Sequence, residues 1–285
     1  VVRQPSVMWL RFEPQMSIDN DQSKNHMAIN TMRSYFTTDL DGSGQIVAVA
    51  DSGLDEDHGD FGTRVVGNYD VIGDGSTADR HSGHGTHVAC TVLGDGTKGG
   101  YAGVAPDAEL YFQAMENDNT GNFVSPSLNY LLNSAYNAGA RIHTNSWGSA
   151  ATSTQGEYTS EAEAVDDRSF NYDKVSNGQE GLTILFAAGD QGVWGREGVG
   201  TKYHPDFPAG SPYVTAVGGT DFKEKGTIGE ETTWPDGGSG FSNDFTRPKW
   251  QDAYVEKYLA EAKGSLPKFP HVYNASSRAY PDLSA

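Results

Sequence analysis

Apolar residues along this chain are spaced so that buried strands alternate with helices. Mostly apolar stretches that end at glycines or turns predict strands at residues 46–50, 109–114, 183–188 and 213–217, and a further strand is expected at 141–147. Helices are expected at residues 84–93, 126–136 and 251–262. Residues 1 to about 30 do not share this pattern and are expected to be extended. The alternation predicts a single α/β domain, with a mostly parallel sheet and helices on both faces.

Polar residues follow several of these strands directly. In a parallel sheet, catalytic and binding residues gather at the carboxyl ends of the strands. Asp51 follows the strand expected at 46–50, and Trp147-Gly148 lies at the end of the strand expected at 141–147. Gly189-Asp190 follows the strand expected at 183–188. We therefore expect a site where these three segments meet.

Composition narrows the classes of function. The 285 residues carry a formal net charge of −18, which disfavours binding to nucleic acids or to anionic membranes. No apolar run approaches the roughly 20 residues of a membrane-spanning helix. Cys90 is the single cysteine, so these residues can form no internal disulfide, and we expect it to be an unreactive core residue. We expect a monomer.

Asp51 and His84 form the candidate catalytic pair. A carboxylate placed directly after a buried strand is costly unless it is hydrogen-bonded. His84 lies 33 residues further on, at the start of an expected helix. A buried Asp that orients a His, which in turn deprotonates a Ser, is the arrangement of a catalytic triad.

The residues around this pair resemble the subtilase family of serine peptidases. Residues 46–55 (IVAVADSGLD) are similar to the family's Asp motif, and residues 82–89 (SGHGTHVA) to its His motif. The resemblance implies a subtilisin-like fold in which Asp51 orients His84, the general base, and His87 has a structural role. Asn145-Ser146-Trp147-Gly148 resembles the family's substrate-binding edge, which implies that Ser146, Trp147 and Gly148 pair with the backbone of a peptide substrate.

The second half of the chain resembles the sedolisins, a sister family of acid serine peptidases, more closely. The similar segments are residues 181–190, 207–220, 240–245 and 274–282. Asp190 then stands where subtilisins usually place an Asn that donates to the oxyanion, and where sedolisins use a protonated Asp. A carboxylate can donate only when protonated, so we expect a pH optimum below that usual for subtilisins, provided that Asp190 is buried. The Glu–Asp pair of the sedolisins, four residues apart, has no convincing match between Gln113 and Arg141.

The nucleophilic serine is not apparent in these residues. Neither Gly-Thr-Ser nor Gly-x-Ser-x-Gly occurs, and in both families the serine follows the region that resembles residues 280–282. We therefore expect the serine beyond residue 285, a propeptide tail at residues 1–16, an incomplete catalytic domain at 17–285, and no activity from these residues alone. The resemblance implies that the propeptide binds its own catalytic domain. It also implies a secreted protein, or one of an acidic lytic compartment.

Metal binding receives little support from the sequence. The spacing of His81, His84 and His87 is unlike the usual zinc patterns. Residues 39–44 (DLDGSG) resemble the start of a calcium loop, but the twelfth position, which requires Glu, is Ala50. We expect no metal ligands in the site and no cofactor for the chemistry, and a structural calcium ion remains open.

Two alternatives to a subtilisin-type enzyme stay open. The sedolisin-like half suggests an acid-acting peptidase. The missing serine motif leaves room for a pseudopeptidase that binds peptides without cleaving them.

Overall fold

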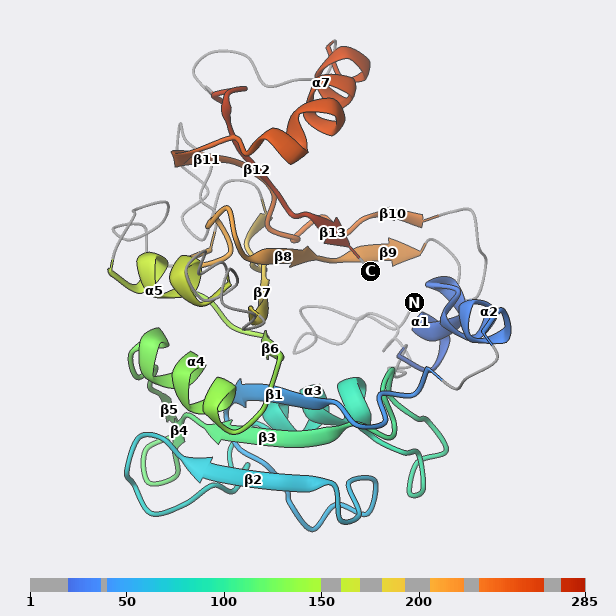
Figure 1. The fold of residues 1–285 in the computed structure, drawn as a ribbon, viewed down its shortest axis with the longest axis vertical. Coiled ribbons are helices and arrows are strands. Elements are labelled where there is room, and N and C mark those ends of the chain that lie inside the picture. The colour runs from blue at the N-terminus through green and yellow to red at the C-terminus, as the bar shows by residue number, and fades with distance from the viewer. Residues whose placement is uncertain are drawn as a thin grey trace, which may run out of the picture.

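The computed structural model describes residues 20–36, 40–149, 160–169, 181–192, 206–222, 231–263 and 273–284. Its centre is a seven-stranded sheet in the order β13-β8-β7-β6-β1-β3-β2, and every neighbouring pair is parallel (Figure 1). The strands are β1 (Ile46–Asp51), β2 (Val65–Asp70), β3 (Glu109–Ala114), β6 (Ile142–Asn145), β7 (Thr183–Ala187), β8 (Thr215–Gly218) and β13 (Leu283–Ser284).

Helices cover both faces of this sheet. Val47 and Val49 of β1 pack in one cluster with Ala89 and Leu93 of α3 (His84–Leu93). On the other face, Ala50 packs in a cluster with side chains of α4 (Leu128–Asn137) and α5 (Ser160–Ser169). Successive residues of β1 therefore point to opposite buried faces, which explains why the strand is continuously apolar.

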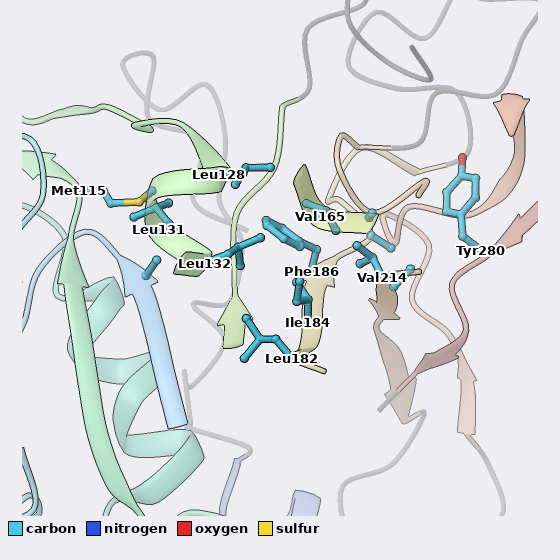
Figure 2. Packing of buried hydrophobic residues seen from close by; sticks show 14 residues of the cluster. Met115, Leu128, Leu131, Leu132, Val165, Leu182, Ile184, Phe186, Val214 and Tyr280 are labelled. Carbon is cyan, nitrogen blue, oxygen red and sulfur yellow. The ribbon is translucent and has the colours of Figure 1, made fainter. Parts of the chain in front are cut away.

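The larger core cluster joins the two halves of the sheet. Leu131 and Leu132 of α4 and Val165 of α5 belong to one cluster with Ile184 and Phe186 of β7 (Figure 2). All five side chains are at most 1% exposed. This packing fixes the position of β7, whose carboxyl end leads to Asp190.

Smaller elements surround the sheet. Two short helices, α1 (Asn20–His26) and α2 (Ile29–Ser34), precede β1. Antiparallel pairs join β4 (Glu116–Asn117) to β5 (Asn122–Phe123), β9 (Thr220–Phe222) to β10 (Glu231–Thr233), and β11 (Gly240–Thr246) to β12 (Ser277–Tyr280). The 3-10 turn η2 (Lys249–Gln251) leads into α7 (Asp252–Glu261). Within the described residues, no helix is both long enough and apolar enough to cross a membrane.

The sequence predicts this architecture well. The expected α/β fold is confirmed, and the boundaries of α3 and β3 agree with the prediction. The expectation of extended chain up to about residue 30 is wrong for its last part, because α1 and α2 lie there. These helices are short, and α2 buries no side chain, so they lack the apolar periodicity that predicts a helix. The predicted propeptide tail at 1–16 lies outside the described residues.

A buried ion pair ties the end of the chain to the sheet. Arg278 in β12 is 0% exposed, and its guanidinium contacts both carboxylate oxygens of Asp282, at 2.8 and 2.5 Å. The same guanidinium donates to the carbonyls of Ser211 and Val214, and Asp282 accepts from the backbone N–H of Ala216 in β8. The ion pair thus ties residues 278–282 to residues 211–216, which lie far earlier in the sequence.

A neutral histidine is buried at the centre of the sheet. His143 of β6 is 0% exposed, with Nε2 3.0 Å from Oε1 of Gln113 and Nδ1 3.0 Å from the amide nitrogen of Asn145. These partners fit a ring that donates from Nε2 and accepts at Nδ1, which is the neutral form. Burial lowers the pKa of His143 to about 3.

This burial predicts a loss of stability in acid. An unfolded His takes up a proton below about pH 6.5, whereas His143 does so only near pH 3, so the unfolded state binds more protons between these values. The free energy of unfolding should fall there with decreasing pH, with a slope of up to about 1.4 kcal/mol per pH unit from this residue. His143→Gln should flatten the slope in urea unfolding measured from about pH 7 to about pH 4. Replacing the exposed His87 by Ala serves as the control, and equal slopes in all three proteins would contradict the assignment.

Candidate active site

Asp51 and His84 lie together, as the sequence predicts. Asp51 ends β1 and is 1% exposed, and its Oδ1 lies 2.6 Å from Nδ1 of His84. The same oxygen accepts the backbone N–H of Ser52 at 2.7 Å. His84 is the first residue of α3, and its side chain is 48% exposed. A buried carboxylate therefore holds one ring nitrogen of a His whose other edge is open to a reactant.

Two glycines allow the helix and the strand end to meet. A Cβ on Gly85 would lie 2.4 Å from the carbonyl oxygen of Gly53, and one on Gly53 would lie 2.3 Å from the carbonyl oxygen of Ala78. The contact is reinforced by the backbone N–H of Gly85, which donates to Oγ of Ser52 at 2.9 Å. A side chain at Gly85 would push α3 away from the turn after β1, and one at Gly53 would displace the loop at Ala78, which explains the glycine in each motif.

Asp79 positions the start of α3 and was missed by the sequence analysis. Its Oδ1 accepts from the backbone N–H of Gly83 at 3.1 Å and from Oγ of Ser52 at 2.9 Å, while Oδ2 accepts from the N–H of Thr86 at 2.9 Å. The carboxylate thus pairs two N–H groups at the positive end of the helix. Its position five residues before His84 was visible, but nothing in the sequence showed that the loop turns back onto the helix.

These carboxylates raise the pKa of His84. The largest cause is the hydrogen bond to Asp51, and the negative charges of Asp51, Asp79 and Asp190 act in the same direction, while burial opposes them. The imidazolium is therefore stabilised in this site. Above this raised pKa the ring is neutral, and only in that form can it accept a proton.

Asp190 lies near this pair, but on the surface. It follows β7 in a bend, its side chain is exposed, and its charge acts on His84. The acidic pH optimum expected from the sequence required a buried Asp190, and the described residues do not bury it. A different carboxylate, that of Asp206, is buried beside Gly189. Asp206 is 6% exposed and lies against two glycines. A Cβ on Gly189 would lie 2.7 Å from its Oδ2, and one on Gly148 would lie 3.3 Å from the same atom.

The predicted substrate-binding edge follows β6. Ser146 and Gly148 are exposed. Trp147 is half-buried, and its indole N–H donates to the carbonyl of Ala50 at 2.8 Å. Its ring makes an edge contact with Phe186 at 5.1 Å between centroids. The ring therefore belongs to the core and anchors the segment beside the end of β1, so the backbone rather than the indole is the part suited to a substrate.

The Glu–Asp pair of an acid-type site is not found on the helices next to this pair. Neither α3 (HGTHVACTVL) nor α4 (LNYLLNSAYN) contains a carboxylate, and both helices are fully described. Within the described residues, a His–Asp pair occupies the place of the base.

Comparisons with known proteins find relatives of this chain. The model of the subtilase family matches residues 42–282. Tripeptidyl-peptidase 1 of Mus musculus is 36% identical over 214 residues, which are 70% of this chain and 36% of the relative. The Homo sapiens protein is 34% identical over 217 residues, 71% of this chain and 37% of the relative. The chain therefore spans little more than a third of the length of these relatives.

A solved structure shows the same fold. The psychrophilic subtilisin-like protease Apa1 from the Antarctic psychrotroph Pseudoalteromonas sp. AS-11 has a TM-score of 0.51 and 24% sequence identity to this chain. The match covers 68% of this chain and 40% of Apa1.

Proposed function

Because the chain belongs to the subtilase family, we propose that the full-length protein is a serine peptidase that hydrolyses peptide bonds with Asp51, His84 and a serine. The observation that supports this most is the 2.6 Å contact between buried Asp51 and half-exposed His84. We propose that the serine lies beyond residue 285, since no serine motif of this type occurs before it.

His84 is the proton carrier of the proposed mechanism. With Nδ1 held by Asp51, Nε2 takes the proton of the serine as its oxygen attacks the scissile carbonyl, and later returns it to the leaving amine. The raised pKa of His84 favours the imidazolium formed in between, which Asp51 stabilises without itself becoming protonated. Peptide turnover by the full-length protein, blocked by a serine-directed inhibitor, tests this proposal.

The substrate is proposed to bind as an added strand. An extended peptide can pair its backbone with an exposed edge, so that main-chain hydrogen bonds provide affinity. Ser146, Trp147 and Gly148 provide such an edge between the ends of β6 and β1, and Trp147 holds it there through its bond to Ala50. In the proposed binding mode, the scissile bond lies close to His84.

A sedolisin-like, acid-acting peptidase is the second candidate. Two observations favour it: the identity to tripeptidyl-peptidase 1, and an Asp rather than an Asn at position 190. The His–Asp pair favours the subtilisin-type mechanism, because a protonated His84 cannot act as a base. Turnover that persists in full below the pKa of His84 would favour the second candidate.

Asp190 is the proposed side-chain donor to the oxyanion, and its replacement should change the pH profile in a defined way. An Asn donates at every pH, whereas a carboxylate donates only when protonated. Loss of one such donor in subtilisin lowers the rate about 10²–10³-fold. Asp190→Asn should therefore raise kcat by up to about that factor wherever the carboxylate is ionised.

Asp190→Asn should also change the kcat/KM profile at acid pH. The charge of Asp190 contributes to the raised pKa of His84, so its removal should shift the acid limb of the kcat/KM profile to lower pH. Profiles of both proteins on one peptide substrate provide the measurement. Superimposable profiles above neutral pH would show that Asp190 is not the donor.

A further inference from the structure

Three potential metal ligands converge beside the candidate active site without being part of it. They are His81, in the loop before α3, and Glu116 and Asp118, which follow β3. One ligand atom of each lies within 4.8 Å of those of the other two. We propose that these three side chains bind a divalent transition-metal ion of the Zn²⁺ type. This inference goes beyond the peptidase function, because none of the three belongs to the proposed triad.

The two carboxylates are buried without adequate partners. Glu116 is 7% exposed, and its Oε1 has no hydrogen bond from the described residues. The side chain of Asp118 is 5% exposed, and neither oxygen has a hydrogen bond there. Among the described residues, the cation beside them is Arg80, whose Nε lies 3.1 Å from Oδ2 of Asp118 and whose side chain is 65% exposed. Two neighbouring buried carboxylates are costly, and a cation between them would offset that cost.

His81 supplies a nitrogen on the open side of the cluster. Its Nε2 lies 2.9 Å from the carbonyl oxygen of Asp118, which can only accept, so this contact fits a ring that donates from Nε2. Nδ1 then has the lone pair that a metal requires, as in metal-binding histidines whose other nitrogen donates to a carbonyl. His81 is exposed, which gives an ion a path from solvent.

The backbone holds the acidic ligands in place. The N–H of Glu116 donates to the carbonyl of Ser52 at 2.9 Å, and the N–H of Asp118 donates to Oδ2 of Asp74 at 2.6 Å. The ligands are therefore positioned before an ion arrives. Ser52 follows Asp51 directly, so the site lies next to the catalytic pair.

The donor set selects the class of ion. One imidazole nitrogen and two carboxylate oxygens, with water in a fourth position, suit Zn²⁺. Ca²⁺ prefers six to eight oxygen ligands and gains little from imidazole. Glu116 and Asp118 reach His81 only through the fold, so the spacing of His81, His84 and His87 in the sequence does not indicate this set of ligands.

A second cluster in the chain provides the control. His58, Asp60 and Cys90 also bring potential ligand atoms within 4.8 Å of one another. Burial, with the charge of Asp60 as a second cause, raises the pKa of the Cys90 thiol to about 11, and Oδ1 of Asp60 already accepts the N–H of Lys98 at 2.6 Å. We therefore expect Cys90→Ser to leave Zn²⁺ affinity unchanged.

The test is titration of the metal-free, full-length protein with Zn²⁺ against a chromophoric chelator. His81→Ala, Glu116→Gln and Asp118→Asn should each weaken binding by about tenfold or more, since even an outer-shell change costs about 10–100-fold. Arg80→Gln should tighten binding, because it removes the cation that competes for Asp118. Co²⁺ bound at this site should show no thiolate charge-transfer band. Thermal unfolding of each variant establishes that it is folded.

Three outcomes would overturn the proposal. They are an absence of Zn²⁺ binding by the folded wild-type protein, binding that is lost in Cys90→Ser but kept in the other variants, and Ca²⁺ binding of equal strength that His81→Ala leaves unchanged. The readout is metal binding, so it does not depend on whether the protein is a peptidase. Peptide turnover measured on the same samples would show separately whether the proposed function fails.

Discussion

His84→Ala is expected to lower kcat of the full-length protein by several orders of magnitude. The substitution removes the ring that Asp51 holds at Nδ1, and with it the proposed base. In subtilisin, loss of the corresponding His costs about 10⁶-fold in kcat. The measurement is kcat on a peptide substrate, with the amount of folded protein determined by thermal unfolding.

His87→Ala is the matched control for this experiment. His87 lies one turn further along α3, is exposed, and should tolerate Ala with little change in kcat. Asp51→Asn should also lower kcat strongly, because an amide cannot stabilise the imidazolium and favours the wrong tautomer. If His87→Ala inactivates a folded enzyme while His84→Ala does not, the base has been assigned to the wrong histidine.

Arg278→Met should destabilise the protein by about 3–5 kcal/mol, the usual cost of leaving one member of a buried ion pair alone. Arg278 is fully buried, and its removal leaves Asp282 without the bidentate contact that neutralises it. The carbonyls of Ser211 and Val214 lose a donor as well. Urea unfolding of the full-length protein measures the change. The urea concentration at the midpoint should fall, while the dependence of the free energy of unfolding on urea stays the same.

An exposed ion pair provides the comparison. In α7, Nζ of Lys257 lies 4.0 Å from Oε1 of Glu261, and the two side chains are 74% and 69% exposed. Lys257→Met should therefore change the free energy of unfolding by less than about 1 kcal/mol. The double variant Arg278→Met, Asp282→Asn should be more stable than Arg278→Met alone, since it removes the unpaired charge. Equal effects of the substitutions at Arg278 and Lys257 would show that the buried pair does not stabilise the fold.

The fold could be predicted from the sequence wherever burial produces a regular arrangement of apolar residues. β1 and β3 are buried on both faces and therefore appear as mostly apolar stretches, with Gln113 as a buried polar residue in β3. β2 was not predicted, because it is the edge strand of the sheet and its residues are at most half-buried. Short antiparallel pairs such as β9 and β10 were missed for the same reason, since β10 is exposed along its length.

The site could be predicted only in part. Asp51 and His84 stand in distinctive local motifs, so sequence and geometry agree on them. Asp79 and Asp206 carry no such motif, and only the fold brings them to the start of α3 and to the glycines at positions 148 and 189. The exposure of Asp190 could not be predicted from the sequence either, because it depends on the turn after β7.

Labelling of the full-length protein with a fluorophosphonate, followed by peptide mapping, tests whether Asp51 and His84 activate a serine. An activated serine reacts with such a probe only when its base is in place. We expect a single labelled serine beyond residue 285, with labelling lost in His84→Ala and kept in His87→Ala. Labelling that is absent from the folded wild-type protein, or that persists fully in His84→Ala, would contradict this expectation.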